Sequence, residues 1–310
     1  MLLTFTMESI NIKSILATLG EKKFSIFTGL KYTFIGNFFS AITPAATGGQ
    51  PVEIYYMNKD GIKAANGTMA MLLQLCGFQI STIVYSIICA ILNPHLLSDG
   101  IVWFYILGIA INGAALAFML ICVFADKLLK RIINWNMNML KKIGLKNADR
   151  MQIKMEEAIN QYSESSAFIK SHMWVFFKAI FRVFIQIGLY HSIPFFVYKA
   201  FGLSDLNFFQ MFSMQAVLYT TVSGIPLPGA IGISETLFLK LYKMAFGEAL
   251  LSGAMLLCRF VSFYFYLIVC AVVVVIVGLK TKSVDNEIDK GIKDIENHDI
   301  KLVSKNIAYV

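Results

Sequence analysis

Charged side chains inside long apolar segments are the residues of this chain that could do chemistry. Lys178 and Arg182 lie four residues apart in one such segment, and Gln186 and Tyr190 continue the same spacing. Because residues four apart share one face of an α-helix, these side chains are predicted to form one polar stripe. An arginine at the centre of a membrane helix costs about 2.5–3.5 kcal/mol on insertion scales, so Arg182, and Arg259 in a later apolar segment, each need a ligand or a partner.

Guanidinium groups hold phosphate or carboxylate through two parallel hydrogen bonds, so Arg182 and Arg259 favour an anionic ligand. Lys178 lies near the start of its segment and can also reach the membrane surface as an anchor. For each arginine two interpretations stay open: direct contact with a substrate, or a structural role in which it caps free carbonyls or pairs with Glu235 or Glu53. Glu235 has a structural interpretation as a helix cap and a functional one in proton or headgroup coupling.

The segments that carry these charges are too apolar for an ordinary soluble domain. Hydrophobic residues make up 57% of the 310 positions and charged residues only 15%. A helix needs roughly 20 apolar residues to cross a bilayer. We therefore predict an all-α polytopic membrane protein with about four full spans, at 64–92, 101–125, 174–201 and 250–279.

Two further apolar segments are interrupted by proline and glycine, which should break a helix at membrane depth. A broken backbone has no water partner in hydrocarbon, so it persists only where protein buries it or a wet cavity touches it. Matched breaks in two parts of a chain are typical of transporter binding sites. Pro44 and Gly48 are spaced as Pro228 and Gly232 are. The predicted break residues are Pro44, Gly48, Gly49, Pro51, Pro226, Pro228, Gly229 and Gly232.

The distribution of lysine and arginine predicts the orientation. The loop at 126–172 is rich in both, whereas the loop at 93–100 has neither, so the first is predicted to be cytoplasmic and the second external. Segment 207–247 must then begin and end outside, as a re-entrant hairpin that turns at 226–232. Lysines on both sides of the first break predict a second, inverted hairpin. The alternative is that 24–42 crosses the membrane once.

These assignments give a membrane domain at 1–279 and a polar cytoplasmic tail at 280–310. Within the first, 126–172 is predicted to hold two amphipathic helices, which either lie on an anionic leaflet or pack against the protein. The five cysteines all fall in apolar runs and are interpreted as small hydrophobic residues. We expect no metal, no other cofactor and no nucleic-acid partner.

The stretch Pro-x-x-x-Gly-Gly-x-Pro at 44–51, followed by Glu53 and Tyr55, occurs together with Pro-x-Pro-Gly-x-x-Gly-x-x-Glu at 226–235. This combination resembles the lysylphosphatidylglycerol synthase transmembrane family, the flippase half of MprF-type proteins. The resemblance implies translocation of an anionic or aminoacylated phospholipid, or another lipid-linked substrate, across the bacterial cell membrane, and a role in resistance to cationic antimicrobial peptides. It also implies site roles for Glu53, Tyr55 and Arg259.

The sequence departs from the family pattern at Gln50 and Ala230, and it has fewer residues before the first motif than members usually have. The family name implies a phosphatidylglycerol lysyltransferase that uses lysyl-tRNA, but the soluble transferase domain is missing here, so we expect no transferase activity from this chain by itself. A non-transporting subunit that positions a separate synthase is the competing interpretation. The protein partners that we consider are a second copy of this chain, in a homo-oligomer, and such a separate synthase. An intramembrane enzyme is disfavoured, because Ser234 has no evident histidine partner.

Overall fold

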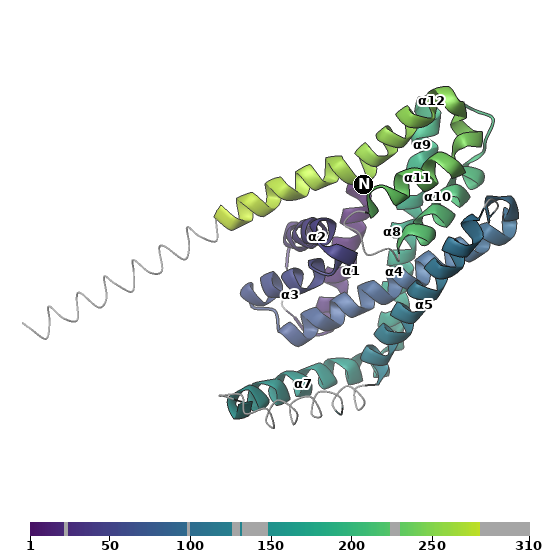
Figure 1. Ribbon diagram of the computed structural model, residues 1–310. Helices are drawn as coiled ribbons and strands as arrows, with labels where there is room; N and C mark the ends of the chain where they lie inside the picture. Colours follow the sequence, from purple (N-terminus) through teal and green to yellow (C-terminus); the bar gives the residue numbers. More distant parts are fainter. Residues whose placement is uncertain (22–23, 98–99, 126–130, 132–147, 224–229, 280–310) are drawn as a thin grey trace, which may run out of the picture.

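The computed structural model describes residues 1–21, 24–97, 100–125, 131, 148–223 and 230–279, and every element in these ranges is helical (Figure 1). The all-α prediction is therefore confirmed. Four helices are long and apolar enough to cross a membrane, as predicted, although the last begins at Lys243 and not near 250. Their bounds are Ala64–Leu92, Ile101–Phe124, Met173–Ala200 and Lys243–Leu279.

The helices differ widely in length, and several long segments are divided by short interruptions. The segment Met173–Ala200 is divided at Ser192, which precedes Pro194. The last segment is interrupted at Gly247, whose φ of +63° is not helical, and a π-helical stretch follows. In chain order the helices are α1 (Leu2–Thr18), α2 (Ile26–Ile42), α3 (Gly49–Lys59), α4 (Ala64–Leu92), α5 (Ile101–Phe124), α7 (Ala148–Ser171), α8 (Met173–His191), α9 (Ile193–Ala200), α10 (Phe208–Ser223), α11 (Ile233–Leu241) and α12 (Lys243–Arg259), with the π-helix at Phe260–Tyr264.

Helix α1 was not predicted, yet it lies at the centre of the fold. It packs against α2, α4 and α8. Ile12, Ile15 and Leu16 on one side are completely buried, and so are the polar residues Ser9 and Asn11. A helix that buries polar as well as apolar side chains has no continuous apolar run, which explains why hydropathy did not identify it.

Buried apolar side chains form two separate clusters. The N-terminal core includes Ile12, Tyr32, Met57, Leu73 and Phe176, and the C-terminal core includes Tyr105, Val197, Met214, Phe238 and Leu251. Helices α4, α5 and α8 contribute residues to both cores, whereas α2 and α3 belong to the first and α10 and α11 to the second. The two predicted broken segments therefore lie against opposite ends of the same long helices (Figure 1).

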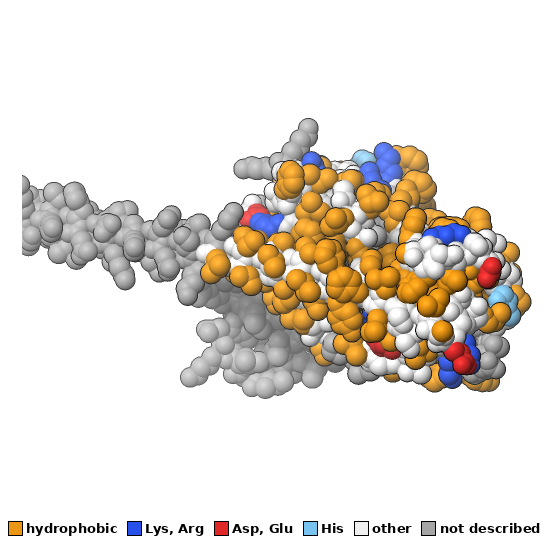
Figure 2. Space-filling model, turned by 90° about the horizontal axis from the view of Figure 1, so that it is seen from above, with side chains coloured by type: hydrophobic (Ala, Val, Ile, Leu, Met, Phe, Trp, Pro, Cys, Tyr) orange, Lys and Arg blue, Asp and Glu red, His pale blue; other side chains and the backbone are white. Residues whose placement is uncertain are grey.

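The outer surface of the protein is largely apolar, as contact with lipid requires. Hydrophobic side chains cover most of the face shown in Figure 2, and the charged side chains are few and scattered. Trp103, Phe209 and Met244 are each about three-quarters exposed. Exposed apolar area on this scale would be a liability in water but is the ordinary exterior of a protein dissolved in a bilayer.

Helix α7, in the predicted cytoplasmic loop, packs one face against α4 and α5. Ile159, Tyr162 and Ile169 are buried on that face. The Tyr162 hydroxyl donates a 2.8 Å hydrogen bond to the Cys122 carbonyl, and the Ser166 hydroxyl donates one of 2.6 Å to the Val123 carbonyl. Apart from residue 131, the first predicted amphipathic helix, near 127–143, lies outside the described residues, and so does the tail at 280–310.

The first broken pair, α2 and α3, is held together by a very close backbone approach. A Cβ atom added to Gly49 would lie 2.0 Å from the Ser40 hydroxyl and 2.6 Å from the Gly36 carbonyl oxygen. Gly36 and Ser40 on α2 are four residues apart, so these small residues form one strip that faces α3. Small residues at this spacing let membrane helices pack backbone to backbone.

Gly49→Ala should force α2 and α3 apart and destabilise the folded protein by about 1–3 kcal/mol, the usual cost of overpacking. The measurement is the thermal unfolding midpoint of the purified protein in detergent. Gly113→Ala in α5 is the matched control, because a Cβ atom there meets nothing within 4 Å and alanine favours a helix. Equal midpoints for the two variants would contradict the close approach.

Candidate functional site

Both breaks contain a strained alanine at the same distance from a proline. Ala46 has φ +54° and Ala230 has φ +48°, and each follows a proline of the paired motifs by two positions. The left-handed region costs a residue with a Cβ atom about 1–2 kcal/mol. Strain of this kind persists where the surrounding structure enforces it and is concentrated at functional segments. The two breaks thus share the spacing of proline and glycine, and each has an alanine with positive φ midway between the two. Pro226, Pro228 and Gly229 themselves lie outside the described residues.

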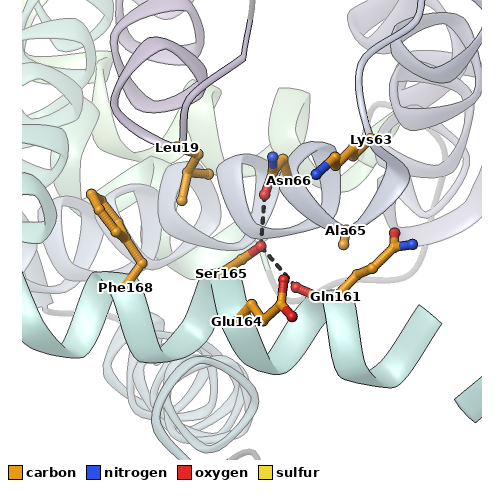
Figure 3. Close-up of a pocket in the computed structure, with 8 residues that line it drawn as sticks. All are labelled: Leu19, Lys63, Ala65, Asn66, Gln161, Glu164, Ser165 and Phe168. Carbon is orange, nitrogen blue, oxygen red and sulfur yellow. Dashed lines mark hydrogen bonds between the residues drawn. The ribbon is translucent and has the colours of Figure 1, made fainter. Parts of the chain in front are cut away.

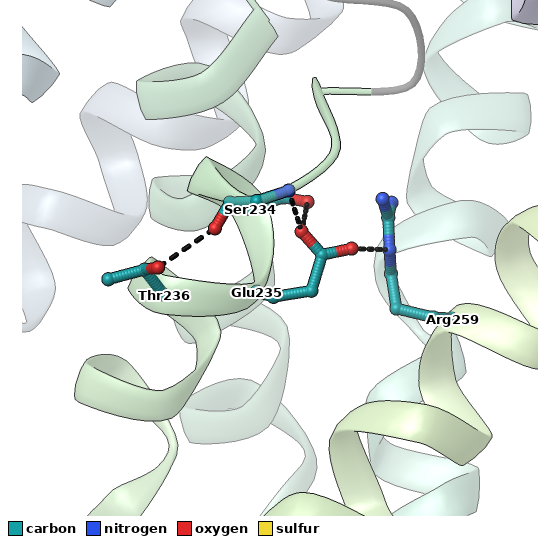
Figure 4. A network of polar contacts seen from close by, with 5 residues as sticks. Ser234, Glu235, Thr236 and Arg259 are labelled. Carbon is teal, nitrogen blue, oxygen red and sulfur yellow. Dashed lines mark hydrogen bonds and ion pairs between the residues drawn. The ribbon is translucent and has the colours of Figure 1, made fainter.

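At the second break, Glu235 caps the start of α11 and binds Arg259 (Figure 4). One carboxylate oxygen accepts hydrogen bonds from the Gly232 amide and the Ser234 hydroxyl, and the other accepts one of 2.7 Å from Arg259 Nε. Gly232 has φ +90°, a conformation that favours glycine. Of the two interpretations of Arg259, the structure shows the pairing with Glu235. The two side chains are 16% and 20% exposed and pair with each other.

A chain of polar side chains crosses the interior between α1, α4 and α8. Asn11 Nδ2 donates to Gln74 Oε1 at 2.5 Å, Gln74 Nε2 donates to Gln186 Oε1 at 3.0 Å, and Gln186 Nε2 donates to Glu8 Oε2 at 3.0 Å. Asn37 on α2 makes a longer contact of 3.5 Å with the same Glu8 oxygen. Glu8 of α1 is thus contacted directly from α8 and α2, and α4 is connected to it through Gln186.

This polar chain lies between the two apolar cores. Along α8, Ile180 packs on the N-terminal core and Tyr190 on the C-terminal core, with Gln186 between them. Along α1, Met1 packs on the C-terminal core and Ile12 on the N-terminal core, with Glu8 between them. We name the set Asn11, Gln74, Gln186 and Glu8 the central polar chain.

Glu53, implied as a site residue by the family resemblance, lies close to this chain. Its side chain is 4% exposed, and its Oε1 atom lies so close to Gly36 that a Cβ atom there would be 1.5 Å away. Neither arginine pairs with it; within the described residues its Oε2 atom has no hydrogen-bond partner. Its electrostatic neighbour is Glu8.

The predicted stripe on α8 divides into two halves. Gln186 is buried in the central polar chain, and the ring of Tyr190 packs edge-on against Tyr219, with centroids 5.3 Å apart. Arg182, one turn before Gln186, is partly buried, and the hydrogen bonds and ion pairs between described residues do not include it. Lys178 is exposed, with its ammonium 5.2 Å from the centre of the Trp174 ring.

The structure does not bring Tyr55 to the other predicted site residues. Its side chain is 60% exposed and packs edge-on against Tyr56. A pocket of about 190 Å³ between α4 and α7 is also separate, since none of the predicted site residues lines it (Figure 3). The Ser165 hydroxyl at this pocket donates a 2.6 Å hydrogen bond to Asn66 Oδ1, which attaches α7 to α4, and it also contacts the Gln161 carbonyl within α7. We interpret this pocket as part of the α4–α7 packing.

Glu8 was not among the predicted site residues, although it is the residue at which the interior contacts converge. One signal could have identified it: Glu8 is the sole acidic residue in the first 20 positions, within an otherwise apolar and neutral-polar helical stretch apart from Lys13. An acid in such a position is by default a functional candidate.

Arg259→Ala and Glu235→Ala should each destabilise the protein, because each removes the opposite charge to which the other side chain is bonded in the interior. Removing one partner of a buried pair costs up to about 3–5 kcal/mol. The double variant should recover part of that loss, measured as the unfolding midpoint and the yield of folded protein. Glu248→Ala is the control, since Glu248 pairs with Lys243 at an exposed position and its loss should change little. A double variant no more stable than either single variant would exclude the mutual support.

The comparisons with known proteins agree with the membrane architecture. A UPF0104 membrane protein of Methanothermobacter thermautotrophicus is 23% identical over 257 residues, which cover 77% of this chain and 73% of that protein. No solved structure matches. Residues 1–270 match the family described as the lysylphosphatidylglycerol synthase TM region, and the chain belongs to that family.

Proposed function

We propose that this protein is a flippase-like lipid translocase that moves an anionic or aminoacylated phospholipid, or another lipid-linked substrate, across the cell membrane. The observation that carries the proposal is the position of the central polar chain: it lies between two apolar cores, each of which holds one broken helix pair. A polar path of this kind is what a lipid headgroup needs in order to cross the apolar part of a bilayer.

The arrangement of the broken pairs supports alternating access. Helices α2 and α10, with 17 and 16 residues, are each about 25 Å long at 1.5 Å per residue, shorter than the roughly 30 Å of hydrocarbon. The pairs lie at opposite ends of α4, α5 and α8, which fits two re-entrant hairpins that approach the midplane from opposite faces. Carriers built from inverted repeats bind substrate at such a midplane.

Arg182 is the residue that we assign to the headgroup. It lies one helical turn from the central polar chain, and it is partly buried without a protein partner in the described part of the chain. A guanidinium in that setting is available to a lipid phosphate, which it can hold in two places at once. Arg259 differs, because Glu235 already accepts its hydrogen bond, and we assign it to the support of the second broken pair.

We further propose that the loop at 126–172 and the tail at 280–310 face the cytoplasm and that 93–100 faces outward. The positive charge of the long loop supports this orientation.

Purified full-length protein in liposomes should speed the exchange of a fluorescent phosphatidylglycerol between leaflets, measured by chemical quenching of the outer leaflet. Arg182→Ala should lower that rate about tenfold or more, the effect of losing a charge-assisted hydrogen bond of roughly 1.5–3 kcal/mol. Arg182→Lys should recover little, because lysine keeps the charge but lacks the planar fork. Lys199→Ala, which removes an exposed cation of α9, is the matched control and should leave the rate unchanged.

Wild-type protein that leaves the exchange rate at that of empty liposomes, with and without a membrane potential, would contradict the translocase proposal. That result would favour the subunit of a separate synthase. Normal exchange by Arg182→Ala would contradict the headgroup assignment alone.

The orientation has its own test. In a cysteine-free background, a cysteine at position 97 should react with an impermeant maleimide added to intact cells, because that loop is predicted to be external. A cysteine at Ala158, an exposed position of α7, should react only after the cells are permeabilised. The reverse pattern would invert the proposed topology.

A further inference from the structure

Glu53 is a buried carboxyl group, and none of the described residues supplies it with a counterion. Its side chain is 4% exposed, its Oε2 atom is buried without a hydrogen-bond partner among the described residues, and its other oxygen lies against the backbone at Gly36. A fully ionised carboxylate in such a place would cost several kcal/mol. A protonated carboxyl group would not, so the surroundings favour a bound proton.

The neighbouring charge makes the case stronger, because it is a second carboxylate. Glu8 on α1 contacts the amide of Asn37 at 3.5 Å, and Glu53 on α3 packs on Gly36, the residue before Asn37, so the two carboxylates lie at the same place on α2. Glu8 is held by the amide groups of Gln186 and Asn37, which donate hydrogen bonds but carry no charge. Two carboxylates that share one poorly solvated site cannot both be ionised without a large penalty.

Nearby cations do not neutralise the pair. Of the described groups on the packed helices, Lys31 of α2 is bonded to Asp60, and Arg259 of the last helix to Glu235. Lys13 of α1 and Arg182 of α8 make no ion pair with either carboxylate, and Lys178 of α8 is exposed beside Trp174.

The remaining titratable groups that face Glu8 are neutral when protonated. They are Tyr266 and Cys270 of the last helix, both of which interact electrostatically with Glu8. The ring of Tyr266 packs edge-on against Phe5 of α1, with centroids 5.6 Å apart. Helix α4 contributes Cys76 and the neutral amide of Gln74 to this region. None of these groups supplies a positive charge.

We propose that Glu8 and Glu53 form a proton-binding site in which the two carboxylates share one proton, and that this proton is the coupling ion of the carrier. Glu8, which is partly exposed, exchanges the proton with water. Glu53 passes the change to the first broken pair, because it lies on α3 directly after the break and packs on Gly36 of α2. Loss of the proton leaves two repelling carboxylates and so drives α3 away from α1. The coupling rests on the proposed lipid translocation, whereas the proton site does not.

Infrared spectroscopy of the purified full-length protein tests the proton site directly. A protonated carboxyl group has a C=O stretching band that an ionised carboxylate lacks. We expect this band in the wild-type protein at neutral pH, with an amplitude of about one carboxyl group per chain, and its loss as the pH is raised.

The variants assign the band. Glu53→Gln removes the carboxyl group that has no partner, and Glu8, which two amide groups hydrogen-bond, then ionises without a like charge beside it, so most of the band at neutral pH should disappear. In Glu8→Gln the like charge is gone but Glu53 stays buried, so its band should persist at neutral pH and be lost at a lower pH than in the wild-type protein. Glu157→Gln, at an exposed position of α7, is the matched control and should keep it. A band that survives in Glu53→Gln overturns the proposal, and so does a wild-type protein with no band at neutral pH. A band in Glu8→Gln that is lost at the same pH as in the wild-type protein contradicts the sharing of one proton. The wild-type spectrum alone shows whether a protonated carboxyl group is present at neutral pH. The proposal can therefore be tested even if a variant misfolds.

Lipid exchange measured with and without a pH gradient tests the coupling separately. We expect the gradient to change the rate several-fold in the wild-type protein and to have no effect in Glu53→Gln. A wild-type band with no lipid exchange under any condition would leave the proton site standing and contradict the proposed function. Lipid exchange in the wild-type protein that ignores the gradient would contradict the coupling.

Discussion

The hydrocarbon of a bilayer offers no hydrogen bonds, so each polar group at membrane depth needs a partner inside the protein. The whole arrangement of α1, α4 and α8 follows from this constraint. Asn11, Gln74, Gln186 and Glu8 are hydrogen-bonded to one another in a line, and each link joins two different helices. These bonds fix which faces of the helices meet, while the apolar cores above and below supply the packing. The central helices are therefore defined by the polar groups that they must bury.

The two broken pairs meet the same constraint in different ways. At the start of α11 the exposed amide of Gly232 is capped by Glu235, and the charge of that cap is balanced by Arg259. In the first pair the backbone itself is packed closely, with Gly49 against Gly36 and Ser40. There no cation among the residues that the structure describes pairs with the carboxylate of Glu53. The two broken pairs thus share the spacing of proline, left-handed alanine and glycine. They differ in charge, because Glu235 pairs with an arginine and Glu53, among the described residues, does not.

Local sequence patterns predicted the features that depend on neighbouring residues. Apolar length located the four long helices, and the proline–glycine motifs located both breaks. Helix α1 escaped because its buried face is polar as well as apolar, and the bond between Gln186 and Glu8 joins residues 178 positions apart. Such a contact leaves no trace in local spacing. The pairing of Arg259 with Glu235 was one of the options open from sequence, but a choice between Glu235 and Glu53 required the three-dimensional structure. The family resemblance implied a site role for Glu53, but it gave no indication that Glu8 lies beside it.

The difference in charge between the halves has a consequence for movement. An ion pair with a capped helix start favours one conformation, because separation of Arg259 from Glu235 would break a charge-assisted hydrogen bond in the interior. A carboxylate pair has no such preference of its own, since its energy depends on whether a proton is bound. In a carrier with one balanced half and one unbalanced half, the unbalanced half is the one that a change in protonation can displace. On the proposed mechanism α10 and α11 are therefore the fixed side of the path, and α2 and α3 are the side that moves.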